Sequence, residues 1–344
     1  MAGSEATREI LSRSRAYMFP WGKGEPPVSR MIDFCLLAEE LGLAGVNVPW
    51  HYTVPKTKSF LAFGTRYLID PVAIVPMILA RTERLVVGLE FALPALHPFV
   101  WAQYFASLDM ASNGRVLVVP VLGWWEEDYK VGLVDKKVRG KRMEEAISTM
   151  RALWNGEPIT ERGECFDSVG LELNPRPVQD PLPVWIGGSE AQAERAARYA
   201  QAIYPLFPTS EEVQDVWIPI AKRALEYGRP QLEIAVVNYV LAHDDPAWFE
   251  EYAHPRLLAR INGLTLDEAV ERMDDPTLNR PTERLMVGSN EECAVRLVEI
   301  LQSGVDHVVV DFYMHGWEPV EFGEEQMRRY AEEIVPLAAQ MMGS

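Results

Sequence analysis

The chain contains Pro183-Val184-Trp185-Ile186-Gly187-Gly188-Ser189, followed directly by the alanine-rich residues 190–199. The apolar residues predict a short buried strand, and the paired glycines let the backbone turn sharply and approach a ligand closely. Ser189 stands at the start of the predicted helix, where unpaired N–H groups and the helix dipole favour a phosphate. An ordinary strand-to-helix turn with Ser189 as N-cap explains the stretch as well. The rest of the chain is needed to distinguish a phosphate-binding turn from such an ordinary turn.

This strand-then-helix unit recurs along the chain. Eight apolar segments alternate with helical ones, a pattern that is typical of parallel βαβ units. Several of them, such as residues 116–121, are apolar without alternation, as expected for strands buried on both faces. Eight units favour a (β/α)8 TIM barrel over an open doubly wound sheet. The predicted strands are residues 15–20, 45–49, 85–91, 115–121, the strand at Val184, and residues 202–206, 232–241 and 305–312.

Helices are predicted between these strands, and two segments depart from the repeat. Residues 155–182 are rich in Pro and Gly and are expected to form a surface hairpin. About residues 243–283 form an extra, mostly helical insertion within a single barrel domain spanning residues 1–344. The predicted helices are residues 29–41, 71–82, 99–110, 137–154, 190–199, 210–227, 290–304 and 323–342.

Composition excludes several classes of partner. The 344 residues carry a net charge of −17, which disfavours binding to nucleic acid or to an anionic membrane surface. No apolar run reaches about 18 residues, so no membrane span is expected. The polar N-terminus lacks an apolar signal core. Three widely spaced cysteines indicate neither a disulfide framework nor a zinc site, and they favour a reducing cytoplasm.

The active site of a barrel lies at the carboxyl ends of its strands. Residues there are mostly aromatic, and they include no carboxylate pair, metal-binding cluster, nucleophile elbow or P-loop. An aromatic mouth with one turn suited to phosphate favours a flat, conjugated, phosphorylated cofactor. The residues in question are 50–52, 90–91, 122–124, 187–189, Tyr204, Phe207 and 238–239.

Several short motifs, in this order, resemble the bacterial luciferase-like monooxygenase superfamily. The resemblance covers residues 31–241 and 285–344, and it implies a barrel that uses reduced FMN or, in one branch, the deazaflavin coenzyme F(420). The motifs are Leu108-Asp109-Met110-Ala111-Ser112-Asn113-Gly114-Arg115, Gly123-Trp124, Arg139-Gly140-Lys141-Arg142-Met143-Glu144-Glu145-Ala146, Leu153-Trp154, Gly163-Glu164, Pro175-Arg176-Pro177-Val178-Gln179 and the opening stretch.

The resemblance implies a phosphate-binding end of the cofactor site. Ser189, after Gly187 and Gly188, matches the position that holds the flavin phosphate, and Gln192 lies one helical turn further on. Bacterial luciferase has a phosphate-binding arginine where this chain has Leu122, so the cation must come from elsewhere in the chain.

The resemblance also implies a ring-binding end. His51 matches the histidine at the mouth beside the reactive face of the ring, where it is a candidate acid, base or stabiliser of an oxygen intermediate. Leu89 and Phe91 flank a position where the family often has a non-prolyl cis peptide. Glu90, between them, is either a site residue or salt-bridged within the barrel, since a buried carboxylate needs a partner. Trp124 is expected to wall the ring or to pack in the core.

Two departures from the family pattern favour FMN over F(420). Trp50 stands where the deazaflavin branch usually has an acidic residue before the mouth histidine. Residues 200–204 replace the family's Ala-Asp-Gly-Trp, as in its sulfonate monooxygenases. We therefore predict a monooxygenase that uses reduced FMN and oxygen on a small organic substrate. Alternatives are hydride transfer with F(420), and a non-catalytic flavin-binding barrel.

The resemblance also implies partners. The chain has no Gly-x-Gly-x-x-Gly unit for NAD(P)H, so a separate flavin reductase is expected. Relatives commonly form dimers through helices beside the second and third strands, and the apolar residues 71–80 are compatible with a homodimer.

Overall fold

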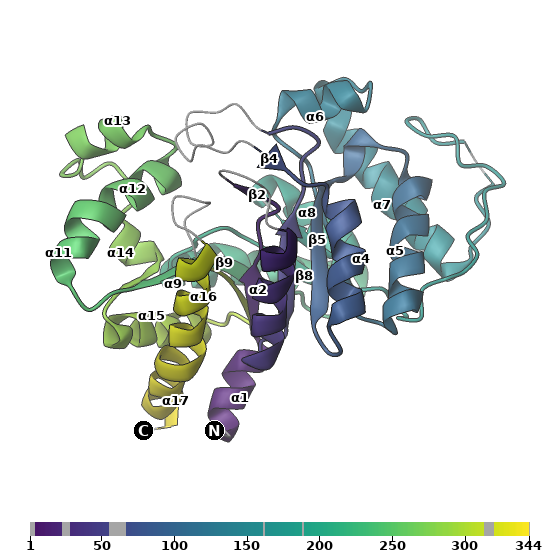
Figure 1. Cartoon of the computed structure of the whole chain (residues 1–344). Helices are drawn as coiled ribbons and strands as arrows, with labels where there is room; N and C mark the ends of the chain where they lie inside the picture. The colour runs from purple at the N-terminus through teal and green to yellow at the C-terminus, as the bar shows by residue number, and fades with distance from the viewer. Residues whose placement is uncertain are drawn as a thin grey trace.

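The computed structural model describes residues 4–22, 28–54, 67–160, 162–187, 189–312 and 320–343. Eight parallel strands form its centre, in the neighbour order β6-β5-β3-β1-β11-β9-β8-β7 (Figure 1). These strands are β1 (Ser14–Tyr17), β3 (Gly45–Pro49), β5 (Val86–Ala92), β6 (Val116–Val121), β7 (Trp185–Gly187), β8 (Ala202–Tyr204), β9 (Glu233–Ala242) and β11 (His307–Asp311).

The two ends of this strand order meet at a narrow seam. A single bridge pairs Val118 of β6 with Val184, just before β7, and the Val118 N–H donates to the carbonyl of Pro183 at 3.0 Å. The result is a nearly closed barrel, so the predicted (β/α)8 architecture is confirmed. Three short strands lie outside this circuit: β10 (Met286–Gly288) extends the pairing along the end of β9, and β2 (Trp21–Gly22) pairs with β4 (Tyr67–Leu68).

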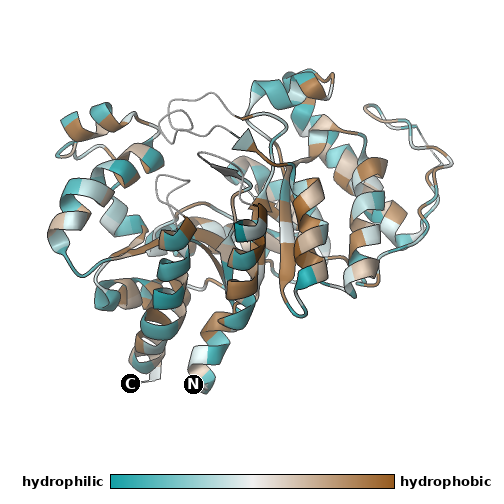
Figure 2. Ribbon diagram, in the orientation of Figure 1, coloured by the Kyte–Doolittle hydropathy of each residue, from teal (hydrophilic) through white to brown (hydrophobic). Residues whose placement is uncertain are grey.

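Helices surround the barrel where the hydrophobic pattern predicts them. Helix α4, for example, buries Ile74, Val75, Ile78 and Leu79, and Asp70 caps its start by accepting from the Val72 N–H. In Figure 2, hydrophobic and hydrophilic residues alternate along these helices. The helices around the barrel are α1 (Glu5–Ser12), α2 (Val28–Glu40), α4 (Pro71–Arg81), α5 (Pro98–Ser112), α6 (Glu126–Val131), α7 (Arg139–Asn155), α8 (Ala193–Tyr199), α9 (Ser210–Glu212), α10 (Ile218–Lys222), α15 (Asn290–Gln302), α16 (Val320–Arg329) and α17 (Val335–Gly343).

Short 3-10 and π segments complete several of these helices. They are η1 (Leu93–Ala95), η2 (Lys136–Val138), η3 (Glu190–Gln192), η4 (Val213–Trp217), η5 (Arg223–Tyr227) and η8 (Tyr330–Ile334). No helix in the described ranges is long and apolar enough to cross a membrane.

The predicted insertion is helical, and it lies at the carboxyl-end side of the strands. It consists of α11 (Pro246–Trp248), η6 (Phe249–Ala253), α12 (His254–Asn262), α13 (Leu266–Glu271) and α14 (Pro281–Arg284). In Figure 1 these helices lie at the upper left and α6 at the upper right, while both termini lie at the lower end. The insertion and α6 therefore flank the mouth of the barrel.

The segment predicted to form a hairpin, residues 155–182, contains no strand among its described residues. Several of its backbone N–H groups donate to carboxylates of the neighbouring helices, and others, such as that of Gly170, donate to carbonyls within the segment. Asp109 of α5 accepts from Val178 and Gln179 at 2.7 and 2.9 Å, and Glu145 of α7 accepts from Cys165 at 2.9 Å. The prolines of this segment, which lack an N–H, further disfavour a strand ladder.

The cis peptide expected near Leu89–Phe91 is also absent. Among the described residues, the cis bonds are Asn174–Pro175 and Asp180–Pro181, so the peptide bonds of β5 are trans. Strand β5 pairs with β6 as far as Ala92 opposite Val121, and this regular register continues through the position in question.

Candidate active site at the barrel mouth

His51 lies two residues after the end of β3, and it has a polar contact with a different part of the chain. Its Nδ1 is 2.7 Å from Oδ2 of Asp128 on α6. The Asp128 side chain is only 1% exposed and that of His51 is 11% exposed. The other oxygen of Asp128 accepts from the backbone N–H groups of Tyr52 and Thr53, at 2.9 and 3.4 Å. Helix α6, which follows β6 in the chain, thus contacts the segment after β3 through Asp128.

Two tryptophans near His51 have different environments. The Trp124 side chain is 48% exposed, and its ring meets the His51 ring edge-on, with the centroids 5.5 Å apart. Trp50 is 4% exposed, packs against Trp101, and donates from Nε1 to Asp70 at 3.2 Å. Trp124 therefore stands at the mouth as a candidate wall, whereas Trp50 belongs to the core beside α4.

Glu90 points into the barrel and has no ion-pair partner among the described residues. It accepts hydrogen bonds from the Tyr17 hydroxyl and, at 3.0 Å, from the Tyr204 hydroxyl. Asn47 donates to the Tyr204 hydroxyl at 3.3 Å. The sequence left open whether Glu90 is a site residue or is salt-bridged within the barrel. Among the described residues, hydroxyl groups from β1 and β8 hold this carboxyl group, and no salt bridge does.

Burial governs the ionisation of this cluster. It raises the pKa of Glu90, and hydrogen bonds from Tyr17, Tyr204 and Asn47 offset part of the rise. Burial and the proximity of Glu90 raise the pKa of both tyrosines well above the usual value, so both hydroxyls remain donors. Beneath them, Arg15 donates from Nε to the Asn47 side chain at 2.8 Å, and burial lowers its pKa to about 10.

Leu89 and Phe91 are buried at 1% and 0% exposure on either side of Glu90. The Phe91 ring packs against Trp101 and Phe105 of α5, with centroids 4.4 and 5.1 Å apart. Because successive side chains of a strand point to opposite faces, Leu89 and Phe91 face the helices while Glu90 faces the lumen. Any contact that they make with a cofactor must therefore come from the backbone.

The predicted phosphate turn follows β7, and Gly188 within it lies outside the described residues. A Cβ on Gly187 would lie 3.2 Å from Cδ1 of Tyr204, so this glycine makes room for that ring. Ser189 is exposed and precedes η3 without capping it through its side chain. Gln192 is buried and accepts from Arg195 at 3.0 Å.

Two arginines near this turn have no carboxylate partner among the described residues. Arg139, the first residue of α7, donates to the carbonyl of Lys136 at 3.0 Å, and its Nε is buried without a partner. The Nε of Arg195 is also buried without a partner. A Cβ on Gly140 would lie 3.1 Å from Nη2 of Arg195, so the start of α7 and the start of α8 lie against each other.

The insertion contributes a cation to the inner side of the mouth. Arg260 of α12 donates from Nε to the hydroxyl of Tyr239 on β9 at 3.2 Å. Tyr239 and Asp311, at the end of β11, are buried at 0% and 1% exposure. Burial disfavours the charged form of Arg260, but the proximity of Tyr239 and Asp311 outweighs it and raises the pKa of Arg260.

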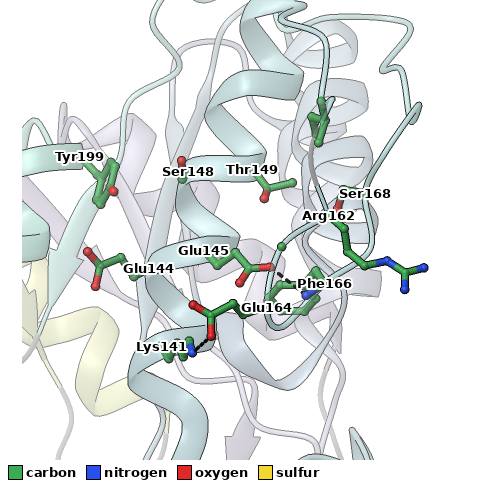
Figure 3. A pocket seen from close by; sticks show the side chains of 12 residues that line it. Lys141, Glu144, Glu145, Ser148, Thr149, Arg162, Glu164, Phe166, Ser168 and Tyr199 are labelled. Carbon is green, nitrogen blue, oxygen red and sulfur yellow. Dashed lines mark hydrogen bonds and ion pairs between the residues drawn. The ribbon is translucent and has the colours of Figure 1, made fainter.

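A separate pocket of about 440 Å³ lies beside α7, and Figure 3 shows its lining. Its charged groups are already paired within the protein. Lys141 pairs with Glu164, Glu144 with Arg198, and Glu145 accepts backbone N–H groups of the following loop. These contacts anchor the irregular segment after α7, and they leave no unpaired charge that points to a ligand.

Sequence reasoning missed most of the polar partners at the mouth. Asp128 lies on a single short helix without a hydrophobic repeat, and the roles of Tyr17, Asn47 and Tyr204 depend on which strands are neighbours. Arg139 lies within a family motif, but nothing in the sequence indicates that its Nε is buried without a partner among the described residues. His97 precedes α5 and caps it, because its Nδ1 accepts from the Phe99 N–H at 3.2 Å. No cluster of metal-binding side chains occurs in the described part of the chain.

Comparison with known proteins identifies the family to which the chain is related. The model of the luciferase-like monooxygenase family matches residues 16–307. The chain is 26% identical over 332 residues to the F(420)-dependent glucose-6-phosphate dehydrogenase of Microbacterium testaceum, covering 90% of this chain and 93% of that protein. It is 24% identical over 319 residues to the FMNH(2)-dependent dimethylsulfone monooxygenase of Pseudomonas fluorescens, covering 85% and 84% respectively.

Solved structures agree on the fold. A monooxygenase from Streptomyces bottropensis superposes with a TM-score of 0.75 at 23% identity, over 94% of this chain and 99% of that one. The family model spans most of the chain, including the eight strands of the barrel up to the start of β11. The chain therefore belongs to the luciferase-like monooxygenase family.

Proposed function

We propose that the protein is a flavin-dependent monooxygenase that uses reduced FMN and molecular oxygen to oxidise a small organic substrate. The observation that carries the proposal is the pairing of His51 with Asp128 beside the exposed ring of Trp124. The acidic neighbour of this histidine comes from α6, whereas the position before it holds Trp50, which is buried in the core. Because the deazaflavin branch usually has an acidic residue directly before this histidine, the tryptophan at that position supports FMN rather than the deazaflavin.

The residues at the phosphate end fit such a cofactor. Ser189 has a hydroxyl that caps no backbone group, and Arg139 has a buried Nε without a partner among the described residues. We propose that these two side chains bind the phosphate, with Arg195 beside them. Arg139 then supplies the cation that Leu122 cannot.

The chemistry supplied by a bound reduced flavin is the activation of oxygen. The chain's own residues orient the reactants and manage protons. His51 gives or takes a proton at Nε2, because its Nδ1 is held by Asp128. Trp124 covers the ring-binding side of the mouth and excludes water from it. Glu90 serves as a second proton-holding group deeper in the barrel, at the end of β5.

The alternative is hydride transfer to or from F(420) without oxygen chemistry. Glu90 favours it specifically, because a buried carboxyl group with a raised pKa is suited to donating a proton while a hydride moves. The 26% identity to an F(420)-dependent dehydrogenase is further support for this alternative.

We propose three further features of the protein in its cell. It receives reduced flavin from a separate reductase and works in the reducing cytoplasm, where its three free cysteines remain thiols. It forms a homodimer through α4 and α5. Support for the dimer comes from the exposed Met77, Val100 and Met110 on these two helices, at 44%, 52% and 48% exposure.

Anaerobic titration of the purified protein with reduced FMN and with F(420) tests the proposal. We expect reduced FMN to bind at least tenfold more tightly, and Arg139→Met to weaken that binding about tenfold. Lys141→Met, two residues further along α7, serves as the matched control and should bind as the wild type does. Tight F(420) binding without FMN binding would establish the alternative.

His51→Ala separates an enzyme from a non-catalytic flavin-binding barrel. With an oxidisable substrate, oxygen and a reductase, kcat is expected to fall ~100-fold or more, because general acid–base groups contribute that much or more. No turnover in the wild type would indicate the non-catalytic flavin-binding barrel, and turnover that is unchanged in the variant would show that His51 takes no part in the reaction.

A further inference from the structure

We propose that Asp128 is a positioning residue that fixes the tautomer and the orientation of the His51 ring. The Oδ2 of Asp128 is 2.7 Å from Nδ1 of His51, within the range of a strong hydrogen bond. The Asp128 side chain is 1% exposed, so water does not compete for this contact. The neutral imidazole then carries its proton on Nδ1, and Nε2 has the lone pair.

The remaining contacts of Asp128 determine which atom donates. Its Oδ1 accepts from the backbone N–H groups of Tyr52 and Thr53. A carboxylate is an acceptor only, whereas a ring nitrogen of imidazole can carry the hydrogen. His51 must therefore be the donor in the shared bond. The same two backbone bonds hold the chain after His51 against α6, so the position of the ring and its proton are set together.

A second contact restrains the plane of the ring. The Trp124 ring meets the His51 ring at an interplanar angle of 81°. Trp124 and Asp128 are four residues apart in the segment after β6, so one short segment supplies both contacts. The catalytic consequence of this arrangement rests on the proposed function, whereas the tautomer itself does not.

The tautomer can be measured directly on the cofactor-free protein. Two-bond ¹⁵N–¹H correlation spectra of histidine-labelled protein distinguish Nδ1–H from Nε2–H, and His51→Gln assigns the signal among the six histidines. We expect Nδ1–H in the wild type at a pH where His51 is neutral. A wild-type signal from the Nε2–H tautomer would overturn the inference without any variant.

Asp128→Asn provides the matched test. The amide oxygen can still accept from Tyr52 and Thr53, but the amide nitrogen now donates to Nδ1 and drives the proton to Nε2. We expect the variant to show Nε2–H. If the folded variant keeps the Nδ1–H tautomer, the inference fails. Glu126→Gln, on the same helix with its side chain 56% exposed, should leave the His51 signal unchanged.

Turnover then links the tautomer to the proposed function. With the wrong nitrogen protonated, kcat of Asp128→Asn should fall ~100-fold to 1,000-fold while KM stays within about twofold. An inverted tautomer together with unchanged turnover in both Asp128→Asn and His51→Ala would reject the acid–base role of His51 but leave the positioning role of Asp128 intact. A twofold or smaller loss of kcat in Asp128→Asn alone would contradict the catalytic consequence.

Discussion

Glu90 shows how one buried side chain links stability to pH. It is 9% exposed and its pKa is raised above 4.5, first by burial. The folded protein therefore holds this proton more tightly than the unfolded chain does. Stability from this group is present below pH 4.5 and is lost as the pH rises through the folded pKa. The hydroxyl groups of Tyr17 and Tyr204 reduce the loss but do not remove it.

Glu90→Gln is therefore predicted to remove a pH-dependent penalty. The amide cannot ionise, so the unfolding free energy of the variant minus that of the wild type should rise between pH 4.5 and pH 8. Urea unfolding at several pH values measures this difference. Glu211→Gln, an exposed carboxylate, is the control, and its difference should be flat. A difference for Glu90→Gln that falls with pH would contradict the prediction.

The elements around the mouth were predictable to different degrees. Strand β3 begins and ends at the predicted residues 45–49, and α4 differs from its prediction by one residue. Both carry strong local signals: β3 is a bounded apolar run, and α4 is a longer apolar run that begins with the N-cap Asp70 and Pro71. Helix α6 has only six residues and no such repeat, so it was missed together with Asp128. Strand β10 was missed because its three residues are defined only by pairing with β9.

One polar contact between the insertion and the barrel can be tested separately from the apolar packing around it. Arg260 is the residue of α12 that donates to Tyr239 on β9. Arg260→Met removes a charged hydrogen-bond donor worth about 1.5–3 kcal/mol from the Tyr239 hydroxyl. Hydrogen exchange in α12 and α13 should accelerate, while exchange in β5 and β6 stays unchanged.

A control on the same helix makes this prediction specific. Arg256 bonds to the carbonyl of Tyr252, within the insertion itself. Arg256→Met should therefore leave the exchange of α13 close to that of the wild type. Equal acceleration in both variants would mean that Arg260 contributes nothing beyond local helix packing.

At the scale of the whole molecule, the face formed by α4 and α5 should be buried against a second copy. Val100→Lys with Met110→Lys places two charges on this face, and their desolvation opposes association. Sedimentation should give a dimer for the wild type and a monomer for the double variant. Val270→Lys, at 53% exposure on the insertion, should remain dimeric. A monomeric wild type at micromolar concentration would reject the proposed dimer.

By itself, the sequence determined the alternation of strands and helices, the (β/α)8 class, the mouth position of His51 and the luciferase-like motifs. These follow from local apolar runs, caps and ordered short motifs, which act over a few residues. A single domain spanning the chain stays a prediction.

Only the tertiary structure decided that Asp128 holds His51, that hydroxyls from β1 and β8 hold Glu90, and that Gly187 makes room for Tyr204. The hydrogen bonds join residues that are 73–114 positions apart in the chain, and closure of the barrel brings these residues together. The contact between Gly187 and Tyr204 joins two neighbouring strands that pair in register. In the turn after β7, Gly187 therefore makes room for Tyr204, which donates to Glu90, while Ser189 and Arg139 remain the proposed phosphate ligands.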